Sequence, residues 1–189
     1  MDSYVISYGL SASLYFRNES KTKKLGSFLG YSPDFEELPS RVTSSLSDIR
    51  SSLASQANLI NLPGAKREIE EASQIMKGKI RIGNLATETS FKNESIYYNI
   101  VHLATHGIIE NQNPDYSKLA LSTDEENDGF LHSYEIRNLN LSANLAVLSA
   151  CESGIGKLAN GEGVMSLSRA FAYAGVPATV VSLWPASDK

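Results

Sequence analysis

The chain has 189 residues, of which 42% are hydrophobic and 20% are charged, so it fits one globular domain with a sizeable core. Its formal net charge of −4 argues against nucleic acid as a direct partner, because phosphate binding requires a basic surface. A single cysteine, no apolar run of the roughly 20 residues that a membrane span requires, and no basic-then-apolar leader predict a cytoplasmic protein without membrane contact.

The first third of the chain carries weak structural signals. Val5–Ser7 and Lys24–Tyr31 are predicted as strands. Residues 40–60 are rich in serine, which favours caps and turns, so we expect a flexible insertion there. The expected arrangement is one domain over residues 1–189 that contains this insertion.

The middle of the chain is more regular. Apolar residues recur with helical spacing at Ala65, Ile69, Ala72 and Met76, and Gly78 is expected to cap that helix. Lys79–Ile82 alternates as a half-buried strand. Tyr97–Ala104 is an almost continuous apolar run, as expected for a strand covered on both faces.

The remaining elements alternate between strand and helix. Leu119–Ser122 and Phe130–Leu131 are predicted to form a hairpin, followed by a short helix over Tyr134–Leu139. The following segments are predicted as a strand, a helix and a strand: Asn144–Ala150, Val164–Phe171 and Ala178–Trp184. This alternation predicts an α/β sandwich with a mostly parallel sheet.

Two strands of that sheet end in reactive side chains, His106 and Cys151. The C-terminal ends of parallel strands meet at one edge of a sheet, where functional residues collect. If the two strands are neighbours, an imidazole and a thiol share that edge. The histidine would take the thiol proton, and backbone N–H groups of Gly107 and Cys151, on turns leaving the strands, are candidate oxyanion donors.

Other interpretations of the same residues remain open. A lone cysteine is often buried and inert, and His102 is expected to be a buried, hydrogen-bonded structural residue. His132 is expected to face solvent or to bond locally. The four-residue spacing of His102 and His106 falls on a strand and does not fit a helical zinc motif, so we expect no metal and no cofactor.

A nucleotide-binding alternative rests on Gly154–Ala159, which fits the loose pattern Gly-x-Gly-x-x-Ala after a strand. Gly161 and Gly163 would interrupt the helix that should hold the pyrophosphate. A flexible glycine loop beside Cys151 is the favoured interpretation. A third function class, a non-catalytic binding module that acts by docking partners, also remains open.

The motifs His102–Gly107 and Leu148–Gly154 resemble the two signatures of CHAT domains. The segments that follow resemble the family in the same order, from roughly Leu62 to the end of the chain: Gly161–Gly163, a helix through Arg169, Ala174–Gly175 and Ser182–Pro185. CHAT domains are relatives of caspases, separases and gingipains.

The resemblance implies a three-layer, caspase-like fold and a cysteine endopeptidase that cleaves a protein or peptide substrate. It implies His106 as general base, Cys151 as nucleophile, and the amides of Gly107 and Cys151 as the oxyanion hole. In this family the domain often follows helical repeats, such as tetratricopeptide arrays, that control it or recruit a partner. We therefore expect a helical-repeat regulatory region.

The sequence departs from the family pattern in two places. Ser153 stands where the family commonly has threonine, a mild change. The resemblance also implies a further helix and strand beyond Lys189 that complete the sheet and the substrate cleft. We therefore expect the sheet to be truncated on its C-terminal side.

Overall fold

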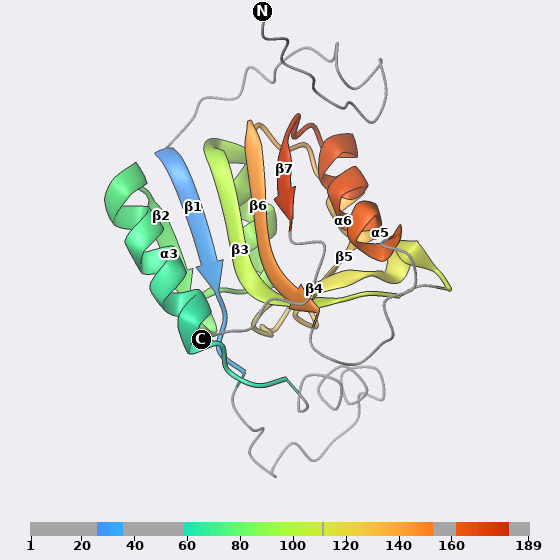
Figure 1. Ribbon diagram of the computed structural model, residues 1–189, viewed down its shortest axis with the longest axis horizontal. Coiled ribbons are helices and arrows are strands. Elements are labelled where there is room, and N and C mark those ends of the chain that lie inside the picture. The colour runs from blue at the N-terminus through green and yellow to red at the C-terminus, as the bar shows by residue number, and fades with distance from the viewer. Residues whose placement is uncertain (1–25, 36–58, 111, 153–161, 182–189) are drawn as a thin grey trace, which may run out of the picture.

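A computed structural model describes residues 26–35, 59–110, 112–152 and 162–181 (Figure 1). The strands are β1 Gly26–Ser32, β2 Lys79–Ile82, β3 Tyr98–Ile108, β4 Lys118–Ala120, β5 Phe130–His132, β6 Leu145–Glu152 and β7 Thr179–Val181. The α-helices are α3 Pro63–Met76, α4 Glu88–Glu94, α5 Ser133–Asn138 and α6 Glu162–Tyr173. The predicted strand at Val5–Ser7 and all but the last two residues of the predicted insertion lie outside the described residues.

The seven strands form one mixed sheet, so the prediction of a mostly parallel sheet needs correction. Parallel pairs join β2, β1, β3, β6 and β7, whereas β4 and β5 pair antiparallel. The reason is the length of β3, which was predicted to end at Ala104 but continues to Ile108. The last residue of β3 that pairs with β1 is Leu103. Further along β3, Gly107 and Ile108 pair with β4.

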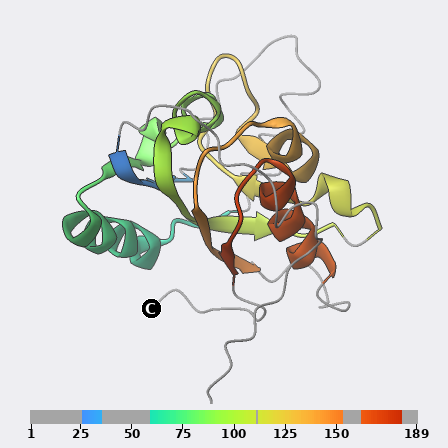
Figure 2. The same ribbon diagram turned by 90° about the horizontal axis from the view of Figure 1, so that it is seen from above.

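Helices cover both faces of the sheet, so the expected α/β sandwich has three layers (Figures 1 and 2). One face packs against α4, α5 and α6 through a core that includes Val101, Leu103 and Phe171. The other face packs against α3 through a smaller core that includes Ile69 and Ala104. Odd-numbered residues of β3 therefore face one layer and even-numbered residues the other, as strand geometry requires.

Two neighbouring residues terminate α3 in different ways. Lys77 adopts the left-handed conformation at φ 50°, the role that the sequence assigned to Gly78. Gly78 is required for another reason: a Cβ at this position would overlap the carbonyl oxygen and the Cβ of Phe28. Phe28 belongs to the core beneath α3, so Gly78 lets the helix return to the sheet in direct contact with β1.

A partly buried ion cluster joins α4 to α5 within the layer that also contains α6. The Nζ atom of Lys92 lies 2.5 Å from Glu88 Oε1 and 3.0 Å from Glu135 Oε1. Burial raises the pKa of Glu88 to about 7. Burial also acts to raise the pKa of Glu135, but hydrogen bonds from His132 and Lys92 outweigh it and lower the value to about 2. His132 thus bonds locally, as the sequence predicted.

Substituting alanine for Gly78 is expected to lower the free energy of unfolding by about 1–3 kcal/mol, the usual cost of overpacking. Lys77→Gly is the matched control, because glycine adopts the left-handed conformation without the steric cost that lysine bears. This control should be no less stable than the wild type. Urea unfolding followed by circular dichroism measures both. Equal stability of Gly78→Ala and wild type would contradict the proposed contact with Phe28.

Candidate active site

The pairing of β3 with β6 brings the two predicted catalytic positions together. The strands are parallel and in register from Ile100 with Leu145 to Gly107 with Glu152, and this register pairs His106 with Cys151. Neighbouring strands lie about 4.8 Å apart, and residues paired in register occupy the same face of a sheet. Position 151 therefore lies directly beside His106, near the C-terminal ends of both strands, on the face that α3 covers.

The imidazole of His106 is buried, and only one of its two nitrogens has a partner. Its Nε2 atom lies 2.7 Å from the backbone carbonyl oxygen of Ile60. A carbonyl oxygen only accepts hydrogen bonds, so Nε2 carries the hydrogen. In the neutral ring, Nδ1 is therefore the unprotonated nitrogen. It is buried and forms no hydrogen bond within the described part of the chain.

The segment before α3 is held in place to make this contact. The amide of Phe35 donates to Asn61 Oδ1 over 2.5 Å. Leu59 and Phe35 pack with Phe130 in a third hydrophobic cluster, and the Phe35 ring lies 5.2 Å from the His106 ring between centroids. The Ile60 carbonyl is thus fixed from both sides, and the orientation of the imidazole is set before any ligand arrives.

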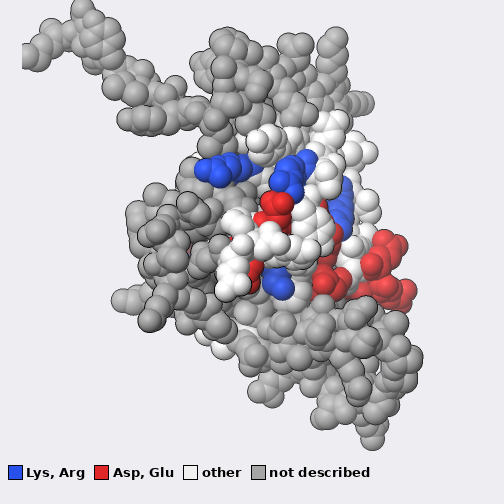
Figure 3. All heavy atoms as spheres, turned by 90° about the vertical axis from the view of Figure 1, so that its right-hand side faces the viewer, with Lys and Arg blue, Asp and Glu red and all other residues white. Residues whose placement is uncertain are grey.

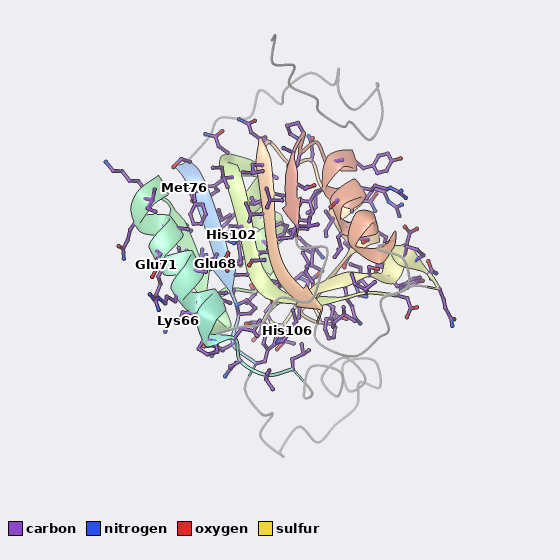
Figure 4. All side chains as sticks on the ribbon, viewed as in Figure 1. Lys66, Glu68, Glu71, Met76, His102 and His106 are labelled. Carbon is purple, nitrogen blue, oxygen red and sulfur yellow. The ribbon has the colours of Figure 1, made fainter. Side chains whose placement is uncertain are left out.

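A second polar group lies on the same face, further back along the strands. Glu68 on α3 points toward the sheet (Figure 4), and its Oε1 lies 2.9 Å from His102 Nε2. The imidazole and the carboxylate are therefore in direct contact. Ser149 on β6 donates to Glu68 Oε2 over 2.9 Å. His102 is thus buried beside a carboxylate.

The pKa of Glu68 reflects these contacts. Partial burial acts to raise it, but the contacts from His102 and Ser149 outweigh burial and lower the pKa below its ordinary value. Glu68 therefore carries a negative charge at neutral pH. Within the described residues, no three His, Cys, Asp or Glu side chains gather closely enough to hold a metal ion.

The predicted oxyanion donors lie within strands, which corrects the expectation that they lie on turns. Gly107 is buried in β3, between Leu119 of β4 and Glu152 of β6. Cys151 is the seventh residue of the eight-residue strand β6, of which the structure describes the backbone. The glycine loop and the dinucleotide-like pattern at Gly154–Ala159 lie outside the described residues.

A family model for the CHAT domain matches residues 1–189, which is the whole chain. The chain belongs to the CHAT domain family. The match begins before Leu62, where the sequence motifs alone placed the start of the resemblance. CHAT domains are a caspase-like peptidase family, and the register of His106 with Cys151 agrees with this membership. No curated protein matches the chain significantly.

Two groups that contact the candidate site were not predicted from the sequence, the Ile60 carbonyl and the Glu68 carboxylate. A backbone carbonyl leaves no signature in side-chain chemistry. Glu68 did leave one: it lies between Ala65 and Ile69, at the border of the apolar stripe of α3, where a charge must face either solvent or the sheet.

No described helix is long and apolar enough to cross a membrane.

Two-bond ¹H–¹⁵N NMR spectra are expected to show neutral His106 with the hydrogen on Nε2, because the Ile60 carbonyl accepts from that nitrogen. His132 is the internal comparison, since its Nδ1 lies 3.1 Å from Glu135 Oε2 and should carry the hydrogen. A spectrum in which His106 carries its hydrogen on Nδ1 would contradict the described orientation of the ring. The chain has only three histidines, which makes the assignment tractable.

Proposed function

We propose that this CHAT domain is a cysteine endopeptidase that cleaves peptide bonds in a protein substrate through His106 and Cys151. One observation supports this most strongly: the register pairs the two residues at the ends of adjacent parallel strands. The Nδ1 of a buried and fixed imidazole supplies the second requirement, a proton acceptor that has no hydrogen-bond partner among the described residues.

The first step forms the acyl-enzyme. His106 Nδ1 takes the proton of the Cys151 thiol, and the thiolate attacks the carbonyl carbon of the scissile bond. The negative charge moves to the carbonyl oxygen, where the amides of Gly107 and Cys151 are the proposed donors. The C–N bond then breaks, the leaving amine takes the proton from His106, and a thioester to Cys151 remains.

The second step releases the acyl product. His106 takes a proton from water, and the resulting hydroxide attacks the thioester carbonyl. The thiolate leaves and recovers the proton. The hydrogen bond from Nε2 to the Ile60 carbonyl stabilises the imidazolium in both steps, because a carbonyl dipole favours the charged ring.

The surroundings of the domain are part of the proposal. We infer a cytoplasmic protein whose peptidase domain is controlled by a helical-repeat region that presents or recruits the substrate. The side of the molecule that carries α5 and α6 shows acidic and basic side chains together rather than a uniformly basic surface (Figure 3). On that face, mixed charge suits a protein partner better than a nucleic acid.

Labelling of the thiol by a peptidyl acyloxymethyl ketone tests the proposal. Cys151 is the only cysteine of the chain, so intact mass reports modification of this residue alone. Replacing His106 with alanine should slow labelling by about 10²–10⁴-fold, the usual contribution of a general base. His132→Ala is the matched control, because it removes an imidazole that bonds to Glu135 instead, and it should label at close to the wild-type rate.

One outcome would count against the peptidase, and a second would require a different variant of His106. Equal labelling rates for wild type and His106→Ala would indicate an unactivated thiol and favour the non-catalytic binding module. Equal loss in both histidine variants, together with a lowered melting temperature, would mean that the effect arises from folding. In that case His106→Gln, which retains an N–H group for the Ile60 carbonyl, replaces alanine in the comparison.

A further inference from the structure

We propose that Lys118 of β4 binds an acidic side chain of the substrate within the first three residues after the scissile bond, the positions P1′ to P3′. This inference rests on the proposed function and deepens it, because it names a feature of the substrate that the same site selects. The contact lies on the leaving-group side of the site, and its partner is an aspartate or a glutamate.

The strand β4 lies on the side of β3 opposite to β6. Gly107 pairs with Glu152 of β6 along one edge of β3 and with Leu119 of β4 along the other edge. Near the end of β3, the strands therefore follow one another in the order β6, β3, β4 and β5 (Figure 1). Viewed from Cys151 on β6, β4 thus lies beyond His106.

The proposed reaction sets the direction in which a substrate crosses these strands. Its acyl part becomes attached to Cys151 on β6, and its leaving amine takes a proton from His106 on β3. The residues after the scissile bond therefore continue from β3 toward β4. They meet β4 before they can reach β5.

Lys118 lies on the same face of the sheet as His106. It pairs in register with Ile108, two residues after His106, and residues that are paired or two apart share a face. Two residues along a strand span about 6.6 Å, and neighbouring strands lie about 4.8 Å apart, so the Cα atoms of His106 and Lys118 are about 8 Å apart. An extended peptide covers that distance in about two to three residues, which gives the range from P1′ to P3′.

The ammonium group of Lys118 has no carboxylate partner among the described residues. Its Nζ lies 4.0 Å from the centre of the Phe130 ring, and it takes part in none of the ion pairs in the described part of the chain. Partial burial lowers the pKa of Lys118, whereas the charges of Asp128 and Glu110 act to raise it. A cation that has lost part of its hydration without gaining an ion pair is stabilised by an incoming carboxylate.

The surroundings of Lys118 fix the position of its charge. The residue lies in a strand that pairs with β3 on one side and with β5 on the other. The Phe130 ring holds the ammonium group through a cation–π contact, and it packs with Phe35 and Leu59 in the apolar cluster beside His106. Apolar neighbours lower the local dielectric constant and so strengthen an ion pair formed beside them. A carboxylate therefore gains more here than at a fully solvated lysine.

Other lysines of the domain already have acidic partners. Lys79 of β2 pairs with Glu94, and Lys92 of α4 pairs with Glu88 and Glu135. A substrate carboxylate would have to compete with those partners, whereas at Lys118 it replaces only water. A basic substrate residue would instead meet a like charge, so the site selects by attraction and by repulsion together.

Cleavage-site profiling of the full-length protein tests the inference. A library of proteome-derived peptides is digested, and mass spectrometry of the new N-termini identifies the residues after each cut. Relative to the library, aspartate and glutamate should exceed lysine and arginine about tenfold at one of the positions P1′ to P3′. Lys118→Met, which keeps an unbranched side chain over Phe130 but removes the charge, should lose this preference. Lys118→Glu should invert it toward lysine and arginine.

Two control variants separate the charge of Lys118 from general effects on folding. Lys79→Met removes a lysine from another strand of the same sheet, and Lys118→Arg keeps the positive charge, so both should keep the wild-type preference. Cleavage without an acidic preference, or loss of the preference in either control, would overturn the role of Lys118 and leave the peptidase intact. No cleavage of any peptide would contradict the peptidase itself, and with it the inference that rests on it.

Discussion

The site depends on the parallel pairing of β3 with β6. Eight residue pairs hold this register, from Ile100 with Leu145 to Gly107 with Glu152. Because side chains alternate between faces, a slip of one residue would move His106 to the face opposite Cys151. The register is held by apolar side chains on the α6 face, where Val101, Leu103, Ala146 and Leu148 are all buried in one core. The apolar core on the α6 face thus determines that His106 and position 151 lie side by side on the α3 face.

The α3 layer adds the polar groups that the two strands lack. The segment that leads into α3 provides the Ile60 carbonyl, which sets the tautomer of His106. One turn into the helix, Glu68 reaches both His102 and Ser149 and so joins α3 to the two strands that carry the catalytic pair. A single helix and its leading segment therefore orient the proposed base and place a carboxylate next to His102 and Ser149. Packing around Gly78 and Phe28 keeps this helix against the sheet.

Much of this could be predicted from the sequence, and the failures have physical causes. The two central strands β3 and β6, the helix over 65–76, the hairpin and the meeting of His106 with position 151 follow from apolar periodicity and strand order, and the structure agrees with them. The strand expected over Ala178–Trp184 is described only as Thr179–Val181, where Val180 is 55% exposed. The sequence did not predict that β3 continues to Ile108, because pairing with β4 depends on where β1 ends. Helix α4 was not predicted either, since seven residues of mixed polarity carry little periodicity. The Glu68 contacts are tertiary and arise only when α3 docks.

The separation between the Cys151 sulfur and His106 Nδ1 in a crystal structure tests the central claim most directly. The register predicts that both atoms lie on the α3 face of the sheet, within about 7 Å, a range that allows for the loose geometry of a resting active site or one bridging water. A sulfur on the α6 face, packed among the side chains around Leu148, would contradict the account, because no rotation of the imidazole could then bring its free nitrogen to the thiol.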